Sequence, residues 1–158
     1  MKSGLKIAAV AVATLAAAAC ATAPLTLNDD LIVRGERIGD VEIGMTLAQL
    51  LALKGTPMQT IPIRGTAATT YAFDGLIVAA HDQVYWIIAT DPRFRTDKGL
   101  TTGAEQIFAR GAYGEPDCVA TKGETTTYDY GDFYFDVEIA TGKVSQIGVQ
   151  RETQTCEG

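Results

Sequence analysis

Apolar and polar positions in the first third of the chain alternate with the period of a short helix. Within residues 47–53 the leucines recur three and four positions apart, so they share one face. Thr46 is placed to cap the first turn, and Gln49 completes a weaker form of the capping box. Gly55 suits a left-handed residue after the helix, and Pro57 prevents its continuation. The pattern predicts a helix over residues 47–53.

The same pattern returns later in the chain. The spacing from Gly103 to Gly114 is 11 residues, as it is from Gly44 to Gly55, and the two copies are 59 residues apart. A second helix is therefore predicted over residues 106–113. Repetition at this period indicates two similar structural units, because one unit cannot bury its own apolar face.

Each predicted helix is followed by segments rich in β-branched and aromatic residues. Asp-Gly and Gly-Asp pairs separate the first two of them in each unit, which is a strong signal for hairpins. The predicted strands are residues 69–73, 76–80 and 84–89 in the first unit and 125–130, 133–139 and 144–149 in the second.

These elements predict an α+β fold of two tandem α-β-β-β repeats, with the helices packed on an antiparallel sheet. The first repeat is expected over residues 36–92 and the second over residues 93–158. The length of 158 residues suits one domain or two very small ones.

Hairpin pairing assigns the two faces of the predicted sheet. Phe133 is expected opposite Tyr130 and Phe135 opposite Tyr128, on a face that continues through Val137 and Ile139 beneath the helices. The outer face then carries Asp129, Tyr134, Asp136 and Glu138 in the second repeat. In the first repeat the same face is apolar and carries Ile77, Ala79, Trp86 and Ile88.

The strongest candidate for partner binding is the aromatic and apolar part of this outer face. It consists of Trp86, Ile88, Ile77 and Tyr134. Trp and Tyr dominate the energetics of protein interfaces, so an open sheet with these residues suits protein recognition. The alternative is that the face is buried between the two repeats or under the N-terminal segment, since large apolar residues are usually inside.

The N-terminus has the layout of an export signal. Lys2 and Lys6 precede an apolar run too short to span a bilayer comfortably, and small residues lead to Cys20. We expect a signal peptide over residues 1–19, lipid attachment at Cys20, and a tether over residues 20–35. Cleavage at an A-x-A site into a secreted form is the main alternative, and a retained membrane helix is another.

The remaining cysteines, Cys118 and Cys156, can pair in an oxidising compartment. Their bridge would close a loop of roughly 39 residues, worth about 4 kcal/mol in the chain-entropy model. The alternative is two unrelated buried thiols.

Charge and composition narrow the classes of function. Thirteen Lys and Arg against nineteen Asp and Glu give a net charge of −6, which argues against nucleic-acid binding. The single histidine, His81, excludes a multi-histidine metal site. It could act as a general base beside Asp82 or Asp74 in a small hydrolase, but no nucleophile motif surrounds it, so a loop histidine is the better interpretation.

The acids of the second repeat could bind calcium through their oxygens, but they alternate along strands, which favours a solvated sheet face. They are Asp129, Asp132, Asp136 and Glu138. We therefore expect no enzyme activity, no metal and no cofactor.

Several short motifs of the first repeat carry a resemblance to a known family. The chain resembles the BamE/OmlA-type outer-membrane lipoproteins in its G-M-T…Q…G-T-P signature, and its duplicated layout is similar to the superfamily that includes the secreted β-lactamase inhibitory protein. The matching residues are Gly44-Met45-Thr46, Gln49-Leu50 and Gly55-Thr56-Pro57.

The resemblance implies a non-enzymatic envelope lipoprotein that binds a protein partner and serves outer-membrane assembly or integrity. It implies a lipid anchor as the sole membrane contact, on the periplasmic face of the outer membrane, and Ala21 after Cys20 is consistent with that sorting. A BamE-type lipoprotein has one such unit and this chain has two. The duplication favours the alternative, an inhibitor or binding module for a periplasmic or secreted enzyme.

Overall fold

The computed structural model describes residues 29–151 and is built mainly from two sheets. Within this part of the chain there are two helices, α1 (Leu47–Lys54) and α2 (Gln106–Tyr113), of eight residues each. No helix among the described residues is long and apolar enough to cross a membrane.

The larger sheet has eight strands in the order β4-β5-β6-β7-β12-β11-β10-β9. Each repeat contributes four consecutive strands, and all neighbours are antiparallel. The strands are β4 (Gln59–Pro62), β5 (Thr69–Phe73), β6 (Leu76–Ala80), β7 (Val84–Ala89), β9 (Cys118–Lys122), β10 (Thr125–Asp129), β11 (Phe133–Glu138) and β12 (Lys143–Gln150). The repeats meet edge to edge where the last strands of each, β7 and β12, pair.

The smaller sheet joins the N-terminal part of the fold to the start of the second repeat. Its order is β3-β2-β1-β8, and β1 pairs in parallel with β8. The strands are β1 (Leu31–Val33), β2 (Arg37–Ile38), β3 (Val41–Glu42) and β8 (Arg95–Thr96). The end of the expected tether, residues 31–33, is thus a strand of the fold.

The prediction of helix-packed α-β-β-β repeats in an α+β fold is wrong, because the structure is mostly β. Each helix is followed by four strands rather than three, and the strands missed by the sequence pattern, β4 and β9, form the two edges of the large sheet. Nearly all their side chains are exposed, so they lack the apolar alternation of a half-buried strand. Two-turn helices of about 12 Å cannot cover eight strands.

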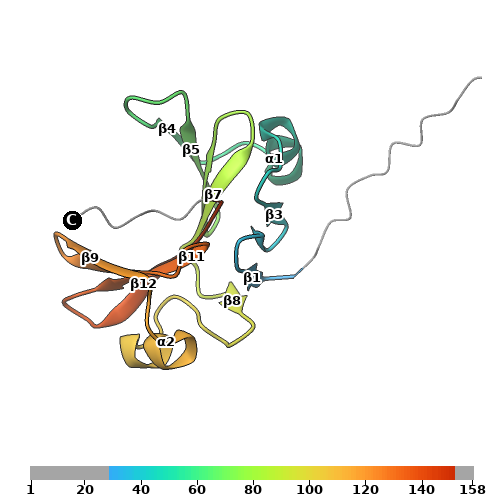
Figure 1. The fold of residues 1–158 in the computed structure, drawn as a ribbon. Coiled ribbons are helices and arrows are strands. Elements are labelled where there is room, and N and C mark those ends of the chain that lie inside the picture. Colours follow the sequence, from blue (N-terminus) through green and yellow to red (C-terminus); the bar gives the residue numbers. More distant parts are fainter. Residues whose placement is uncertain (1–28, 152–158) are drawn as a thin grey trace, which may run out of the picture.

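The inner face of the large sheet forms the core together with the small sheet and the helices, which lie on the same side (Figure 1). Each helix fully buries a single residue, Leu50 in α1 and Ala109 in α2. The small sheet and the loops around it add Ile32, Ile38, Val41, Phe94 and Leu100, all at most 4% exposed. The core therefore depends more on sheet-to-sheet contacts than on helices.

The local predictions for the helix ends are confirmed. Thr46 accepts a hydrogen bond from the backbone N–H of Gln49 at 3.2 Å, and the Gln49 side chain accepts from the backbone N–H of Thr46 at 2.9 Å. Gly55 and Gly114 both have a φ of 76°, a conformation that favours glycine. The chain thus ends both helices in the same way.

The hairpin pairings are also confirmed, with one exception at the end of β11. Tyr128 lies opposite Phe135, and the backbone N–H of Tyr130 donates to the carbonyl of Phe133 at 2.8 Å. β10 and β11 stay in register as far as the Thr125–Glu138 pair, whereas the pairing of β11 with β12 shifts register between Asp136 and Val137. Ile139, expected beneath the helices, follows the strand and is 55% exposed.

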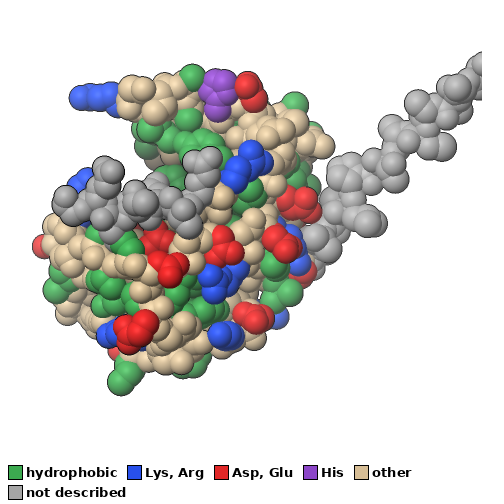
Figure 2. Space-filling model, in the orientation of Figure 1, with side chains coloured by type: hydrophobic (Ala, Val, Ile, Leu, Met, Phe, Trp, Pro, Cys, Tyr) green, Lys and Arg blue, Asp and Glu red, His purple; other side chains and the backbone are tan. Residues whose placement is uncertain are grey.

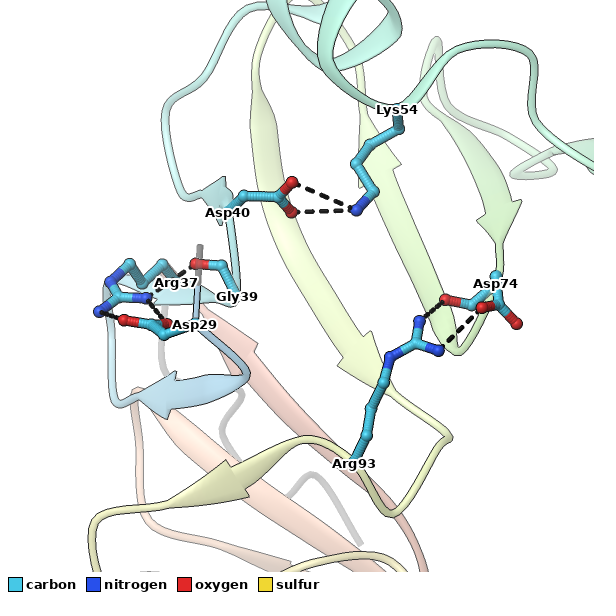
Figure 3. A network of polar contacts seen from close by, with 7 residues as sticks. All are labelled: Asp29, Arg37, Gly39, Asp40, Lys54, Asp74 and Arg93. Atoms are coloured by element: carbon cyan, nitrogen blue, oxygen red, sulfur yellow. Dashed lines mark hydrogen bonds and ion pairs between the residues drawn. The ribbon is translucent and has the colours of Figure 1, made fainter. Parts of the chain in front are cut away.

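Three basic side chains tie the loops to the fold (Figure 3). Arg37 pairs with Asp29 at 2.7 Å, and Lys54 at the end of α1 pairs with Asp40 at 3.0 Å. Arg93, in the segment between β7 and β8, pairs at 2.8 Å with Asp74 in the β5–β6 turn. The last contact holds the hairpin of the first repeat against the start of the second.

Candidate functional site

The four residues expected to bind a partner lie on the outer face of the large sheet. Tyr134, Gly148, Ile88 and Ile77 are direct cross-strand neighbours on four adjacent strands. Trp86 lies one row further along, where it is the neighbour of both Gln150 and Ala79. The face thus runs unbroken across the junction between the repeats.

These side chains form a packed surface rather than a projecting patch. Tyr134 and Ile88 are each 5% exposed, while Ile77 and Trp86 are half-buried. The repeats join edge to edge through β7 and β12, so this face belongs to one continuous sheet. The other form of the alternative, burial under the N-terminal segment, concerns residues before 29, which lie outside the described part of the chain.

Tyr134 covers Gly148 directly. A Cβ atom on Gly148 would lie 1.9 Å from Cε1 of Tyr134, so no larger residue fits beneath the ring. The ring also meets Trp86, with centroids 6.2 Å apart and planes tilted by 40°. Gly148 is therefore required for space, and it fixes where the aromatic pair sits.

A cavity of about 220 Å³ opens beside this aromatic pair. We call it the Trp86 pocket. Its walls come from one strand of the first repeat and three of the second, and its lining residues are Trp86, Thr127, Asp129, Tyr134, Asp136, Gln146 and Gln150.

Asp136 lies in the wall of the Trp86 pocket and is 9% exposed. One carboxylate oxygen accepts a hydrogen bond from the hydroxyl of Thr127 and the other from the side-chain amide of Gln146, both at 2.6 Å. Burial raises the pKa of Asp136, and these two donors oppose the shift. The geometry holds the carboxylate in a fixed orientation.

Asp129 is the second buried carboxylate of the pocket, at 6% exposed. It accepts from the backbone N–H of Gly131 at 2.7 Å and from the side-chain amide of Gln150 at 3.4 Å. Burial raises its pKa as well, against the effect of these hydrogen bonds. The prediction that both acids belong to a solvated face is wrong, because cross-strand neighbours enclose them.

Two polar atoms in the pocket have no hydrogen-bond partner among the described residues. They are the indole Nε1 of Trp86 and the hydroxyl Oη of Tyr134, both buried. Burial raises the pKa of Tyr134 well above its usual range. Asp136 adds to this shift, and a contact between the hydroxyl and the Trp86 indole N–H opposes it, although this contact does not have the geometry of a hydrogen bond. Unpaired buried donors are rare in native proteins, so these two require an explanation.

The two carboxylates of the pocket have no positively charged partner among the described residues. Neither Asp129 nor Asp136 forms an ion pair within residues 29–151, although other acids of the second repeat do: Asp132 binds Arg34 at 2.7 Å. Glu138 is exposed at the end of its strand and accepts from Thr141. The four acids considered above as possible calcium ligands thus lie in different surroundings.

The described residues contain no group of three or more His, Cys, Asp or Glu side chains placed to hold a metal ion. His81 lies in the exposed β6–β7 turn, where its Nδ1 is 2.9 Å from Oδ2 of Asp82. Histidine is purple in Figure 2 and lies at the surface. It does not line the Trp86 pocket. The chemistry available in the pocket is hydrogen bonding, charge attraction and aromatic contact.

The cysteine predictions fall largely outside the described residues. Cys118 begins β9 and lies opposite Asp129 of β10. Cys156 and the expected lipid site, Cys20, lie outside residues 29–151. The Cys118–Cys156 bridge and the lipid attachment stay predictions.

Sequence reasoning placed the aromatic pair and the two acids on one face but did not predict that they line a pocket. Thr127, Gln146 and Gln150 give no chemical signal as single residues. Period-two alternation did place Asp129 and Asp136 on the face of Tyr134, and an acid beside an aromatic residue on one face was the available signal.

Comparison with known proteins gives little further guidance. No protein-family model and no curated protein matches the sequence. Among solved structures, the fold is similar to an extracellular protein containing a SCP domain from Bacillus anthracis str. Ames, with 10% identity and a TM-score of 0.49. The match covers 68% of this chain and 43% of that protein, so the chain spans less than half of its length.

Proposed function

We propose that this chain is a non-enzymatic envelope lipoprotein that binds a protein partner through the outer face of its large sheet. The observation that carries the proposal is the Trp86 pocket, where two buried polar atoms, Trp86 Nε1 and Tyr134 Oη, have no hydrogen-bond partner within residues 29–151. Leaving such groups unpaired costs free energy on folding. A partner that supplies the missing hydrogen bonds recovers this free energy on binding.

The composition of the pocket suits protein recognition. Trp and Tyr are the residues most enriched at binding hot spots, and here they are held by packing before any partner arrives. Gly148 fixes Tyr134, and hydrogen bonds fix Asp136. A preorganised surface loses little conformational entropy on binding.

The location in the proposal rests on the sequence. Export over residues 1–19, acylation of Cys20 and sorting to the periplasmic face of the outer membrane place the sheet near envelope proteins. The resemblance to BamE/OmlA-type lipoproteins supports a partner in outer-membrane assembly or integrity. Metabolic labelling with a fatty acid tests the anchor: wild type becomes labelled and Cys20→Ala does not.

Site-specific photo-crosslinking in cells tests the partner surface. A crosslinking amino acid replaces Gln146, a half-buried residue of the pocket wall, in the full-length protein. The matched control places it at Ile107, which is 83% exposed on α2. We expect a defined protein adduct from position 146 that is absent from position 107. Equal adducts from both positions, or none from position 146, would contradict the proposal.

The identity of the adduct then separates the two forms of the proposal. Envelope assembly or outer-membrane proteins would support the scaffold role. A single periplasmic or secreted enzyme would favour the inhibitor role, for which the crosslinked complex should be inactive in that enzyme's assay.

A further inference from the structure

We infer that the Trp86 pocket holds a basic side chain of the partner, with arginine preferred over lysine. This inference rests on the proposed function, because it names the chemistry by which that surface recognises its partner. It is carried by three features of the pocket: two buried carboxylates with no cationic partner among the described residues, an aromatic pair beside them, and a volume suited to one side chain.

The charge of the pocket is the first argument. Buried carboxylates are normally paired, and Asp129 and Asp136 have no ion pair among residues 29–151. Their present donors are neutral: a hydroxyl, two side-chain amides and one backbone N–H. An ionised carboxylate accepts more hydrogen bonds than these provide. A cationic donor is the complementary ligand.

The aromatic pair selects the kind of cation. A cation over the face of Trp or Tyr is attracted by the ring, and the weakly hydrated, planar guanidinium stacks there more readily than ammonium. Tyr134 lines the pocket and is only 5% exposed, yet its hydroxyl has no hydrogen-bond partner in the described part of the chain. The indole N–H of Trp86 needs an acceptor, which the backbone carbonyl of a peptide supplies.

The size of the pocket indicates the size of its ligand. About 220 Å³ is smaller than the roughly 300–1,000 Å³ typical of drug-sized ligand sites, so one side chain suits it better than a whole small molecule.

The chain itself does not supply the cation. Its segment 152–158 contains two glutamates and no Lys or Arg. Arg151 does not line the pocket, and one of its guanidinium nitrogens lies beside Gly44. No Lys or Arg of residues 29–151 lines the pocket, and Lys2 and Lys6 lie in the expected signal peptide. The basic side chain is therefore assigned to another protein.

Trp86 is the single tryptophan of the chain and reports on the pocket directly. The full-length protein in detergent is titrated with the peptide acetyl-Gly-Arg-Gly-amide, and the fluorescence of Trp86 is followed. The same peptide with lysine tests the preference, and the same peptide with citrulline removes the charge while keeping the shape. Titration to about 50 mM detects dissociation constants in the tens of millimolar.

We expect saturable binding of the arginine peptide, weaker binding of the lysine peptide and none of the citrulline peptide. Asp136→Asn and Asp129→Asn should each weaken arginine binding by about tenfold or more. Asp129→Asn keeps a side-chain oxygen that can accept from the Gly131 N–H, so the turn should be preserved. This variant therefore tests the charge of the pocket even if Asp136→Asn fails to fold. Glu138→Gln is the matched control, because it removes one charge from an exposed site on β11, the strand that carries Asp136. It should change affinity less than about twofold.

The outcomes separate this inference from the proposed function. No response to the arginine peptide, or equal binding of the citrulline peptide, overturns the inference. If position 146 still crosslinks a partner in that case, the proposed function stands on other contacts. If the arginine peptide binds as expected but position 146 captures no protein, the cation site is real and the proposed partner surface is wrong.

Discussion

Replacing Tyr134 by phenylalanine should stabilise the protein, although it removes a polar group from the proposed binding site. The Oη atom is buried and has no hydrogen-bond partner among the described residues. Such a hydroxyl costs about 1–3 kcal/mol relative to its hydrated state in the unfolded chain. The ring stays on Gly148 in both proteins, so packing is preserved.

The net gain should be about 1–2 kcal/mol, which corresponds to a rise in Tm of roughly 2–8 °C for a chain of this size. Chemical denaturation with urea, analysed with equal m-values for both proteins, measures the difference in unfolding free energy. The matched control is Tyr130→Phe. Its hydroxyl is also on a buried tyrosine but donates to the carbonyl of Gly114 at 3.0 Å.

Tyr130→Phe should therefore lose about 0.5–1.5 kcal/mol, the usual contribution of one hydrogen bond. The opposite signs of the two substitutions are the test. If Tyr134→Phe also destabilises the protein, the hydroxyl has a partner in solution, and the argument that the pocket awaits a ligand group fails.

Three further predictions follow from the same region. Gly148→Ala should cost roughly 2–3 kcal/mol in urea denaturation, because its Cβ would meet the Tyr134 ring, and a Tyr134→Ala background should remove most of that cost; an additive result would refute the contact. Burial raises the pKa of Asp129 in the folded protein above its unfolded value of about 3.9. The unfolding free energy of the wild type should therefore fall as pH rises from the unfolded pKa to the folded pKa. The unfolding free energy of Asp129→Asn relative to wild type should accordingly increase from pH 4 to pH 7, and a flat or falling difference would show that burial does not control this group. Cys118→Ser should lower Tm in non-reducing buffer by an amount that corresponds to about 4 kcal/mol, and an unchanged Tm would exclude the Cys118–Cys156 bridge.

Predictions that depend on neighbours in the sequence succeeded. The capping box of Thr46 and Gln49 and the positive φ of Gly55 are properties of a few consecutive residues. The hairpins at Asp74-Gly75 and Gly131-Asp132 formed as expected, because the two-residue link itself sets the register of the flanking strands.

Predictions that depend on distant neighbours failed or were incomplete. Ile139 looked like a core residue from alternation alone, but β11 ends at Glu138, and Ile139 is 55% exposed just after it. The edge strands β4 and β9 carry exposed side chains, so the hydrophobic pattern did not distinguish them from loops. Short helices flanked by strong strand signals then suggested an α+β repeat in place of one mostly β fold.

The sequence by itself determined the duplicated unit, the helix ends, the hairpins and the face on which Trp86 and Tyr134 lie, because each depends on contacts within a few residues. Only the tertiary structure decided that the two repeats share one sheet and that Asp129 and Asp136 are buried. Trp86 and Asp136 are 50 positions apart and meet only because β7 pairs with β12. Burial and pKa depend on what surrounds a group in space, and that environment is assembled from strands whose pairing no local pattern specifies.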